Sequence, residues 1–461
     1  MTRDSNIAAL ALAMEDMFAR MANAHRRSDK GPRPLGLPDW DRELWRLARG
    51  CLPPVAAEAP THGPDLYLAT QIYKGGGHTG LIGDFVQALD PGANNSHLIV
   101  SNLYNENKSP LDEKISSRTR IHPSNTYLLE GPHIGDRLQQ LMTRVQSLRP
   151  GRVFLFHHPG DPLPAAVAHP EWTSQCVLVH HADATPSFGL YFPGVQPIEL
   201  HPFGAAATRI LGLAPEILML SAPDPGPRSG NFLASGTLTT ASCGSTLKFE
   251  SPYHYSYPET IAVLLAHTGG KHVHIGPLTD NLLKSIATHL HHHQVQEDRF
   301  HHVPWVPSLS QALWDHDCDL YFSSFPIDGA RVNAEVAAAA VPHLRHARSM
   351  PLKGMQSDPL GLKGGLAWHT WSDLKNQLTK AANADFLIRR STEIRETYDA
   401  LHHPRVFTKT LTDILAGKTG IADPIADNRE NRALRSTLQR LEIAGLFPDK
   451  SPELASGAED A

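Results

Sequence analysis

The sequence is poor in cysteine and carries no excess of basic residues. Its 461 residues include four cysteines, Cys51, Cys176, Cys243 and Cys318, and no Cys-x-x-Cys pair, so neither a zinc site nor a thioredoxin-like motif is indicated. The formal net charge is −5. A chain without a basic surface is not expected to bind nucleic acid.

Long apolar runs are also lacking. No uninterrupted apolar stretch reaches the roughly 18 residues that span a bilayer, so we expect no transmembrane segment. Residues 1–50 have an amphipathic helical pattern, and Glu15 and Asp16 interrupt it where a signal peptide would be apolar. Because widely spaced cysteines are typical of reduced thiols, we expect a cytoplasmic protein.

Apolar, β-prone runs alternate with helical patterns in both halves of the chain. The expected strands cover 65–70, 97–103, 152–159, 176–183, 197–202, 232–242, 271–278, 301–306 and 320–326, and the expected helices cover 79–89, 134–148, 258–267 and 279–292. This alternation predicts mostly parallel sheets with helices on both faces.

A stretch rich in proline and glycine, residues 221–230, separates the two halves. We therefore predict an α/β protein with two Rossmann-like doubly wound domains facing a cleft, residues 51–222 and 231–371. Residues 1–50 precede them as a helical segment, and helices within 372–461 are expected to pack across both domains. In such sheets, ligands bind beyond the carboxyl ends of the strands.

Residues 299–343 read as strand, short helix, strand, glycine-containing loop and an alanine-rich helix that opens on Glu335. Backbone N–H groups near Gly329 and the helix N-terminus could face a diphosphate, with Arg331 and Asn333 in the same loop and helix start. Glu335 could accept hydrogen bonds from ribose hydroxyls. An ordinary βαβ crossover with a surface glutamate has the same pattern.

Lys248 follows the first expected strand of the second half, after a turn at Gly244 and Ser245. A cation at this place would neutralise negative charge on a departing diphosphate. The alternative is a solvated surface lysine.

In the first half, Gly75, Gly76 and Gly77 stand between an expected strand and an expected helix. Glycines at such a turn let a ligand approach the backbone closely. The adjacent His78 could take a proton from an acceptor hydroxyl. A tight turn with a solvated histidine is the alternative.

His181 and Asp183 end another apolar strand, so a histidine oriented by a carboxylate is feasible there. His157 and His158 end a further strand and could line the same crevice. Histidines that only cap strand ends would give the same pattern. A catalytic imidazole would impose an acidic limb on the pH–rate profile near its ordinary pKa of about 6.5.

A histidine tract lies at the end of the expected helix 279–292, and it contains His289, His291, His292 and His293. No carboxylate or cysteine completes a recognisable ligand set. We interpret the tract as an exposed helix end and predict no metal site.

The second half resembles the donor domain of the two-Rossmann (GT-B) glycosyltransferases, nearest to the O-GlcNAc transferase and bacterial N-glucosyltransferase group. Lys248 matches the diphosphate-binding lysine of that group, and Gly329 and Glu335 match its glycine loop and ribose-binding acid. Pro304 and Pro307 match the proline-containing strand end, and Pro342 matches the closing proline.

The chain also departs from that pattern. Gln311 stands where the group often has a base-stacking histidine, and residues 330–332 replace its His-Thr-Thr run. The chain has no tetratricopeptide array of the kind that presents protein acceptors in that group.

The resemblance implies a metal-independent Leloir-type glycosyltransferase that needs no cofactor. It implies a nucleotide-sugar donor, with UDP expected, bound by residues 231–371, and a glycan, lipid-linked or protein acceptor on the side of residues 51–222. A bacterial enzyme of surface polysaccharide assembly would fit. A nucleotide-sugar epimerase or hydrolase on the same scaffold and a non-catalytic nucleotide-sugar-binding protein are the alternatives.

Overall fold

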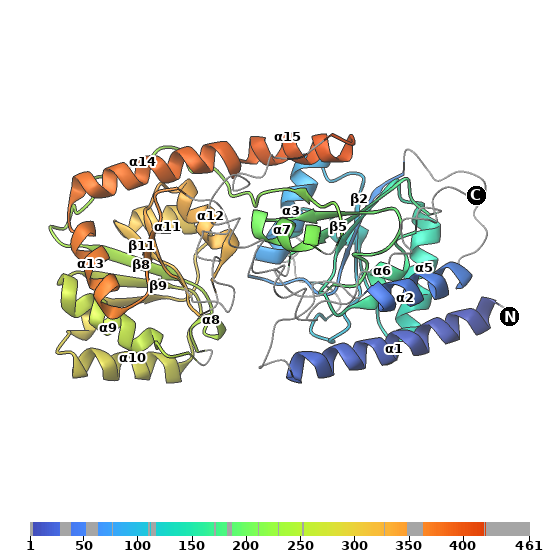
Figure 1. Cartoon of the computed structure of the whole chain (residues 1–461), viewed down its shortest axis with the longest axis horizontal. Helices are drawn as coiled ribbons and strands as arrows, with labels where there is room; N and C mark the ends of the chain where they lie inside the picture. The colour runs from blue at the N-terminus through green and yellow to red at the C-terminus, as the bar shows by residue number, and fades with distance from the viewer. Residues whose placement is uncertain are drawn as a thin grey trace. The chain divides into compact units, whose positions relative to one another are not determined.

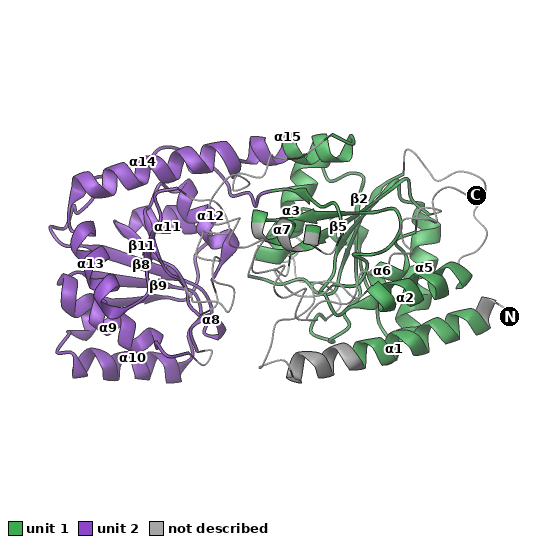
Figure 2. Cartoon of the chain, viewed as in Figure 1, with its two compact units in different colours: residues 1–218, 410–426, 432–461 green, residues 219–409, 427–431 purple. Residues whose placement is uncertain are grey.

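The computed structural model describes residues 3–27, 38–51, 63–75, 77–108, 111, 117–169, 172–181, 187–210, 212–228, 230–250, 253–326, 328–347, 363–418 and 420. The chain divides into two compact units (Figure 2). Unit 1 comprises residues 1–218, 410–426 and 432–461, and unit 2 comprises residues 219–409 and 427–431.

Unit 1 is built on a seven-stranded sheet with the order β3-β2-β1-β4-β5-β6-β7, and neighbouring strands run parallel. Its strands are β1 (Asp65–Ala69), β2 (Ser96–Val100), β3 (Thr126–Leu128), β4 (Arg152–Phe156), β5 (Gln175–His180), β6 (Val195–Glu199) and β7 (Glu216–Ile217). Strands β2 and β5 of this sheet are labelled in Figure 1. The strand order reverses between β1 and β4. Their carboxyl ends therefore form the topological switch point at which such sheets bind ligands.

The helices of unit 1 are α1 (Arg3–Arg27), α2 (Pro38–Cys51), α3 (Gly77–Leu89), α5 (Ile134–Leu148), α6 (Pro162–Ala166) and α7 (Pro202–Ile210), with a 3₁₀ turn, η1, at Pro123–Asn125. Successive residues of β1 point to opposite faces of the sheet. Leu66 and Leu68 share a core with residues of α1, α2 and α5, whereas Tyr67 stacks on Phe154 on the other face. Phe85 of α3 also contacts Phe154.

Unit 2 contains a six-stranded sheet with the order β10-β9-β8-β11-β12-β13, again with parallel neighbours. Its strands are β8 (Thr239–Cys243), β9 (Lys271–Ile275), β10 (Phe300–Val303), β11 (Leu320–Phe322), β12 (His343–His346) and β13 (Leu366–Trp368). Here the switch point lies between β8 and β11, because the chain builds the sheet outward in both directions from β8.

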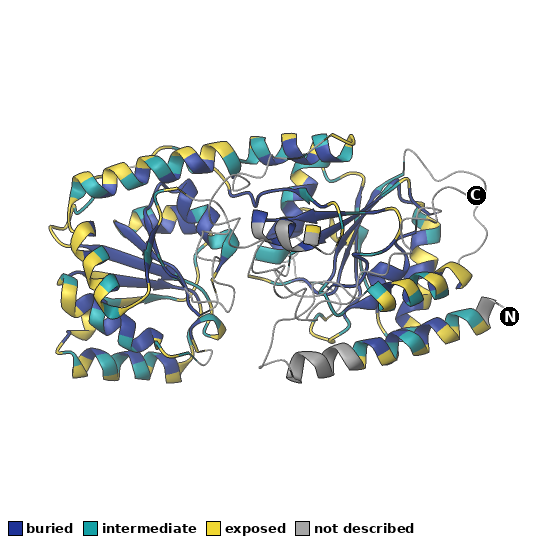
Figure 3. Cartoon of the chain, in the orientation of Figure 1, coloured by how far each residue is buried: buried dark blue, intermediate teal, exposed yellow. Residues whose placement is uncertain are grey.

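The helices of unit 2 are α8 (Leu247–Glu250), α9 (Tyr257–Thr268), α10 (Asp280–His292), α11 (Leu309–Asp315), α12 (Ala330–Ala338), α13 (Trp371–Ala381) and α14 (Ala384–Leu401), with a 3₁₀ turn, η2, at Glu297–Arg299. Phe322 of β11 packs into a core with α9 and α13, and Tyr321 packs on the opposite face with α11 and α12. Most strands are buried, although the edge strands β3 and β10 are only partly so, and the helices keep exposed outer faces (Figure 3).

The final described helix, α15 (Pro404–Leu415), begins in unit 2 and ends in unit 1, with the boundary between Lys409 and Thr410. Helices were expected throughout 372–461, and α13, α14 and α15 occupy the described part of that region. Residues 421–461 lie outside the described residues. No helix in the described part of the chain is long and apolar enough to cross a membrane.

The predicted α/β architecture of two doubly wound parallel sheets is confirmed, although several boundaries differ. The strand expected over 232–242 begins only at Thr239. Leu233 and Gly236 have φ angles of 57° and 78°, which belong to turns and cannot continue a strand. The short strands β3, β7, β12 and β13 were not predicted, because two to four residues carry too little periodicity to identify.

Candidate active site

Three imidazoles meet at the carboxyl edge of the unit 1 sheet. His78 lies in the first turn of α3, which follows β1, while His158 follows β4 and His181 follows β5. The ring centroids of His78 and His181 are 4.5 Å apart, those of His78 and His158 5.7 Å, and those of His158 and His181 6.2 Å. Because β1, β4 and β5 are neighbours, residues more than 100 positions apart in sequence form one histidine cluster, which we define as His78, His158 and His181.

Backbone carbonyls fix the tautomers of two of these rings. His78 Nε2 lies 2.7 Å from the carbonyl oxygen of Phe156, and His181 Nδ1 lies 3.3 Å from that of Val179. A carbonyl oxygen only accepts hydrogen bonds, so each of these ring nitrogens donates a proton. The lone pairs therefore lie on Nδ1 of His78, which is buried without a hydrogen-bond partner, and on Nε2 of His181.

The histidine cluster is neutral at pH 7. Burial lowers the pKa of His78 to about 4, and the neighbouring His158 adds to the shift. Burial, followed by the charges of His78 and His158, lowers the pKa of His181 well below 6.5. Burial also lowers the pKa of His158, against the opposing carboxylate of Glu106. An acidic limb due to these groups would therefore fall below the pH of about 6.5 expected for an unperturbed imidazole.

A buried carboxylate organises the loops that carry this cluster. Asp161 is completely buried and accepts hydrogen bonds from the hydroxyls of Thr70, at 2.7 Å, and Ser101. The Thr70 hydroxyl in turn accepts a hydrogen bond from the backbone N–H of His158 at 2.7 Å. Because Thr70 and Ser101 directly follow β1 and β2, Asp161 fixes the ends of two strands and the backbone of His158 together.

The remaining residues proposed for this edge are only partly described. Gly75 is exposed, and a Cβ atom there would meet no atom within 4 Å, so packing within the protein does not require glycine. Gly77 is the first residue of α3. Gly76 and Asp183 lie outside the described residues, and their proposed roles stay predictions.

In unit 2, three loops converge beyond the carboxyl ends of the strands. Lys248 of α8 donates a hydrogen bond from Nζ to the carbonyl oxygen of Asp328 at 2.8 Å, which joins the loop after β8 to the loop after β11. A Cβ atom on Gly276, after β9, would lie 2.3 Å from the carbonyl oxygen of Gly244. Lys248 and Gly329 are thus brought together, since a Cβ on Gly329 would lie 3.1 Å from the Lys248 ammonium.

Hydrogen bonds to the Asp328 side chain hold the loop before α12 in shape. The carboxylate of Asp328 accepts hydrogen bonds from the backbone N–H of Gly329 at 2.7 Å and from the buried Asn333 amide at 3.2 Å. Asn333 therefore holds the loop. The helix begins at Ala330, so the expectation that it opens on Glu335 is wrong; Gly329 acts as the N-cap residue, and Glu335 lies in the second turn.

Arg331 and Glu335 lie on the same face of α12, with 3.4 Å between Nε and Oε1. The thiol of Cys243, at the end of β8, is influenced by both charges of this edge. Burial, and next the Glu335 carboxylate, raise its pKa to about 12 against the effect of Lys248. A carboxylate and an ammonium group therefore act on the same end of β8.

A second group of histidines in unit 2 lies underneath the turn after β8. His272 bonds to the hydroxyls of Thr240 at 2.8 Å and Ser242 at 2.6 Å. His274 bonds to the Tyr257 hydroxyl at 2.7 Å and to the carbonyl oxygen of Gly244 at 3.1 Å. Both rings are completely buried, and every ring nitrogen has a partner. These imidazoles support the turn and are unsuited to proton transfer.

Two residues assigned to the donor site from sequence, Pro307 and Gln311, are exposed. The Gln311 amide donates a hydrogen bond to Asp315 at 2.7 Å within α11. The sequence prediction missed Trp305, which follows β10 and is 69% exposed. Its signal in the sequence was a tryptophan between Pro304 and Pro307, directly after an expected strand.

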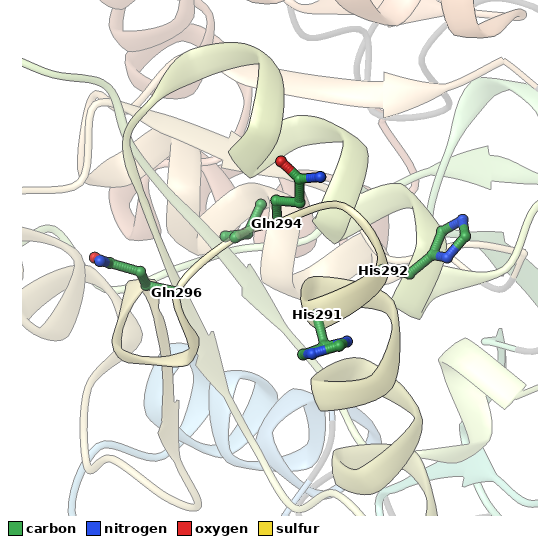
Figure 4. Close-up of a pocket in the computed structure, with 5 residues that line it drawn as sticks. His291, His292, Gln294 and Gln296 are labelled. Carbon is green, nitrogen blue, oxygen red and sulfur yellow. The ribbon is translucent and has the colours of Figure 1, made fainter.

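The histidine tract at the end of α10 borders an open hollow of about 560 Å³ that is lined by His291, His292, Gln294, Val295 and Gln296. Figure 4 shows His291 and His292 pointing in different directions from the helix end. In the part of the chain that the structure describes, no three histidine, cysteine, aspartate or glutamate residues are grouped so that they could hold a metal ion.

The sequence matches no protein-family model and no curated protein, but the structure is similar to solved glycosyltransferase structures. HepE of Anabaena in complex with UDP and glucose has a TM-score of 0.57 and 11% sequence identity, covering 77% of this chain and 100% of HepE. The lipopolysaccharide outer core galactosyltransferase WaaB has a TM-score of 0.54 and 11% identity, covering 77% of this chain and 99% of WaaB. Sucrose-phosphate synthase from Thermosynechococcus elongatus has the same TM-score and identity, covering 77% and 98%.

These similarities define the class of the fold. The chain has the GT-B architecture of two Rossmann-like α/β units, as the sequence predicted. Its nearer likeness to the O-GlcNAc transferase group stays a prediction.

Proposed function

We propose that this protein is a Leloir-type glycosyltransferase that moves a sugar from a UDP-sugar to an acceptor hydroxyl. The observation that carries the proposal is that Lys248, after β8, donates a hydrogen bond to Asp328 in the loop that leads into α12, the helix that carries Arg331 and Glu335. A cation for a diphosphate and an acceptor of ribose hydroxyl hydrogen bonds are the two groups that a nucleotide-sugar site requires. HepE, which shares the fold, has been solved with UDP and with UDP-glucose.

The donor roles follow from charge and position. Lys248 neutralises the diphosphate as it leaves, with Arg331 as a second cation, so the reaction proceeds without a bound metal. Glu335 binds the ribose. The exposed indole of Trp305 stacks on the nucleobase, since every base offers a flat face to an aromatic ring.

The acceptor roles belong to the histidine cluster. His181, whose Nδ1–H is held by the carbonyl oxygen of Val179, takes the proton from the acceptor hydroxyl through Nε2, and His78 is the second candidate for this role. The acceptor oxygen forms the new bond to the anomeric carbon while the bond from that carbon to the diphosphate breaks, which releases UDP. A neutral imidazole suits this step because its lone pair is available at pH 7.

The acceptor is a glycan, a lipid-linked sugar or a protein, and the reaction belongs to surface polysaccharide assembly in the cytoplasm. The test begins with calorimetric titration of UDP, ADP and GDP, followed by UDP release from a panel of UDP-sugars with and without acceptors. Acceptor-dependent UDP release supports the proposal. Donor turnover that needs no acceptor would indicate an epimerase or hydrolase instead, and UDP binding without any turnover would indicate a binding protein.

A further inference from the structure

One aromatic side chain beside the histidine cluster is partly exposed to solvent, although burial of its ring would stabilise the folded protein. Tyr104, on the loop after β2, is 40% exposed. Its ring centroid lies 5.9 Å from that of His158 and 5.8 Å from that of Phe18 on α1. Tyr104 therefore lies beside His158 of the histidine cluster, between His158 and Phe18, with part of its ring exposed to solvent.

The loop that carries Tyr104 is held rigidly by paired amides. The Asn102 amide donates to the carbonyl oxygen of Asn107 at 3.1 Å, and its side-chain oxygen accepts the Asn107 N–H at 3.0 Å. Asn107 also forms two hydrogen bonds with the backbone of Ile72, at 2.8 and 3.2 Å, which tie the loop to the segment after β1. These hydrogen bonds hold the loop in one conformation. Tyr104 therefore loses little conformational entropy when a ligand binds.

Two asparagines on either side of this ring adopt left-handed backbone conformations. Asn102 and Asn105 have φ angles of 52° and 59°, a region that asparagine enters more readily than most residues other than glycine. The Asn105 side chain accepts a hydrogen bond from Arg137 at 2.5 Å, which helps to hold the turn in place.

The surroundings of Tyr104 favour a neutral, hydroxyl-rich ligand. The ring of Tyr73 stacks on His158 with centroids 6.1 Å apart, and its hydroxyl lies 3.3 Å from His158 Nε2. Glu106 lies two residues after Tyr104 on the same loop and is exposed. Burial and then Glu106 raise the pKa of Tyr73, and burial, Asp161 and then Glu106 raise the pKa of Tyr104. A carboxylate and phenol groups form hydrogen bonds with sugar hydroxyls, whereas that carboxylate repels a phosphate.

We infer that Tyr73, Tyr104 and His158 form an aromatic shelf that binds a pyranose ring of a neutral glycan acceptor. The C–H face of the sugar stacks on the Tyr104 ring, and its hydroxyls reach Glu106 and the tyrosine hydroxyls. This places an acceptor hydroxyl next to the histidine cluster. The inference rests on the proposed function and narrows its acceptor from three classes to one.

Direct binding tests the aromatic shelf independently of any donor. Saturation-transfer NMR and calorimetry would use the methyl glycosides of glucose, galactose, mannose and N-acetylglucosamine, together with the corresponding β-linked disaccharides. We expect the wild-type protein to bind at least one of them, and Tyr104→Ala to weaken that binding about tenfold, the size of an aromatic stacking contribution. Tyr104→Phe, which keeps the ring, should recover most of the affinity.

The matched control is Tyr127→Ala, because Tyr127 of β3 is a half-buried tyrosine of the same unit that stacks on His97 instead. It should leave glycoside binding unchanged. In turnover assays, Tyr104→Ala should raise the acceptor KM much more than it lowers kcat, with UDP affinity unaffected.

Three results would overturn the inference: equal glycoside affinity in Tyr104→Ala, equal loss in Tyr127→Ala, or no saccharide binding by a protein that binds vesicles containing an anionic polyprenyl phosphate. UDP binding is measured separately. A protein that binds glycosides through Tyr104 but neither binds UDP nor turns over UDP-sugars would refute the proposed function and leave the aromatic shelf standing.

Discussion

Both units place histidines near the carboxyl ends of parallel strands, but the two groups have opposite chemical character. In unit 2, all four ring nitrogens of His272 and His274 are hydrogen-bonded under the Gly244 turn. In unit 1, the rings of His78 and His181 each retain a lone pair, and Nδ1 of His78 has no hydrogen-bond partner. A saturated imidazole stabilises a fold, whereas one with an available lone pair can accept a proton.

Charged side chains, in contrast, are gathered at the candidate site of unit 2. Lys248, Arg331 and Glu335 gather at the sheet edge of unit 2, while the histidine cluster of unit 1 is kept neutral by burial. A diphosphate is stabilised by fixed positive charge, and deprotonation of a hydroxyl needs a base that is unprotonated at the working pH. This difference is what the proposed function requires, with donor binding at the sheet edge of unit 2 and acceptor activation at that of unit 1.

The largest effect is expected from removing the base. His181→Ala should lower kcat about 10²- to 10⁴-fold, the usual contribution of a general base, with UDP affinity intact. In the wild type, the rate should fall only as the pH drops below about 6.5, because the lowered pKa keeps the imidazole unprotonated down to more acidic pH.

Two companion variants sharpen this assignment. If His181→Ala retains turnover while His78→Ala loses it, His78 is the base. His272→Gln should lower the melting temperature and leave the pH–rate profile unshifted, because its bonds only support the β8 turn. A shifted profile in His272→Gln would break the distinction between the two histidine groups.

The next largest effect concerns charge on the leaving group. Lys248→Ala should lower kcat about 10²-fold or more, comparable with loss of an oxyanion donor, and should weaken UDP-sugar binding much less. Lys271→Ala, which removes an exposed lysine from the amino end of β9, is the matched control. Near-normal kinetics in Lys248→Ala would show that this lysine is only a link to Asp328.

Ribose recognition should give an intermediate effect. Glu335→Ala should weaken UDP binding by about 2–3 kcal/mol, because ribose hydroxyls would lose a charged acceptor. Calorimetry with UDP measures the change, and Glu297→Ala, an exposed glutamate in η2, serves as the control. Unchanged UDP affinity would show that Glu335 pairs with Arg331 but does not bind the ribose.

The smallest effect is expected at the nucleobase. Trp305→Ala should weaken UDP binding by about 1–2 kcal/mol, at the lower end of base–aromatic stacking contributions, while Trp305→Phe keeps part of it. Quenching of tryptophan fluorescence by UDP in the wild type, lost in Trp305→Phe, would place the base on this ring. Equal UDP affinity in wild type and Trp305→Ala would show that Trp305 does not contact the nucleobase.

The fold was predictable because its signals are local and repeated. Runs such as 271–278 combine apolar and β-branched residues with helical patterns on either side, and this alternation specifies a parallel sheet. Short strands such as β13 (Leu366–Trp368) are defined by their pairing with β12, which no local pattern records. The left-handed turn at Leu233 could not be predicted for the same reason. Tertiary packing determines it, although the local sequence is apolar and strand-like.

The candidate site was predictable in its residue types and less so in its pairings. Placement after strands identified His78, His181 and Lys248, because carboxyl ends of parallel strands share one edge. The sequence could not reveal that Asn333 bonds to Asp328 or that Arg331 pairs with Glu335, since these contacts depend on where α12 begins. Tyr104 was not singled out, because its place beside His158 depends on amide contacts between two separate loops.

The close approach of Gly276 to Gly244 has a consequence for the heat of nucleotide binding. The carbonyl oxygen of Gly244 occupies the space where a side chain on Gly276 would stand, so the two turns interlock and neither can rearrange alone. The same carbonyl is anchored from below by His274. A turn that is already ordered has little motion to lose, so UDP should bind unit 2 with a small entropic penalty from this segment, and Gly276→Ala should weaken the nucleotide mainly through a less favourable entropy.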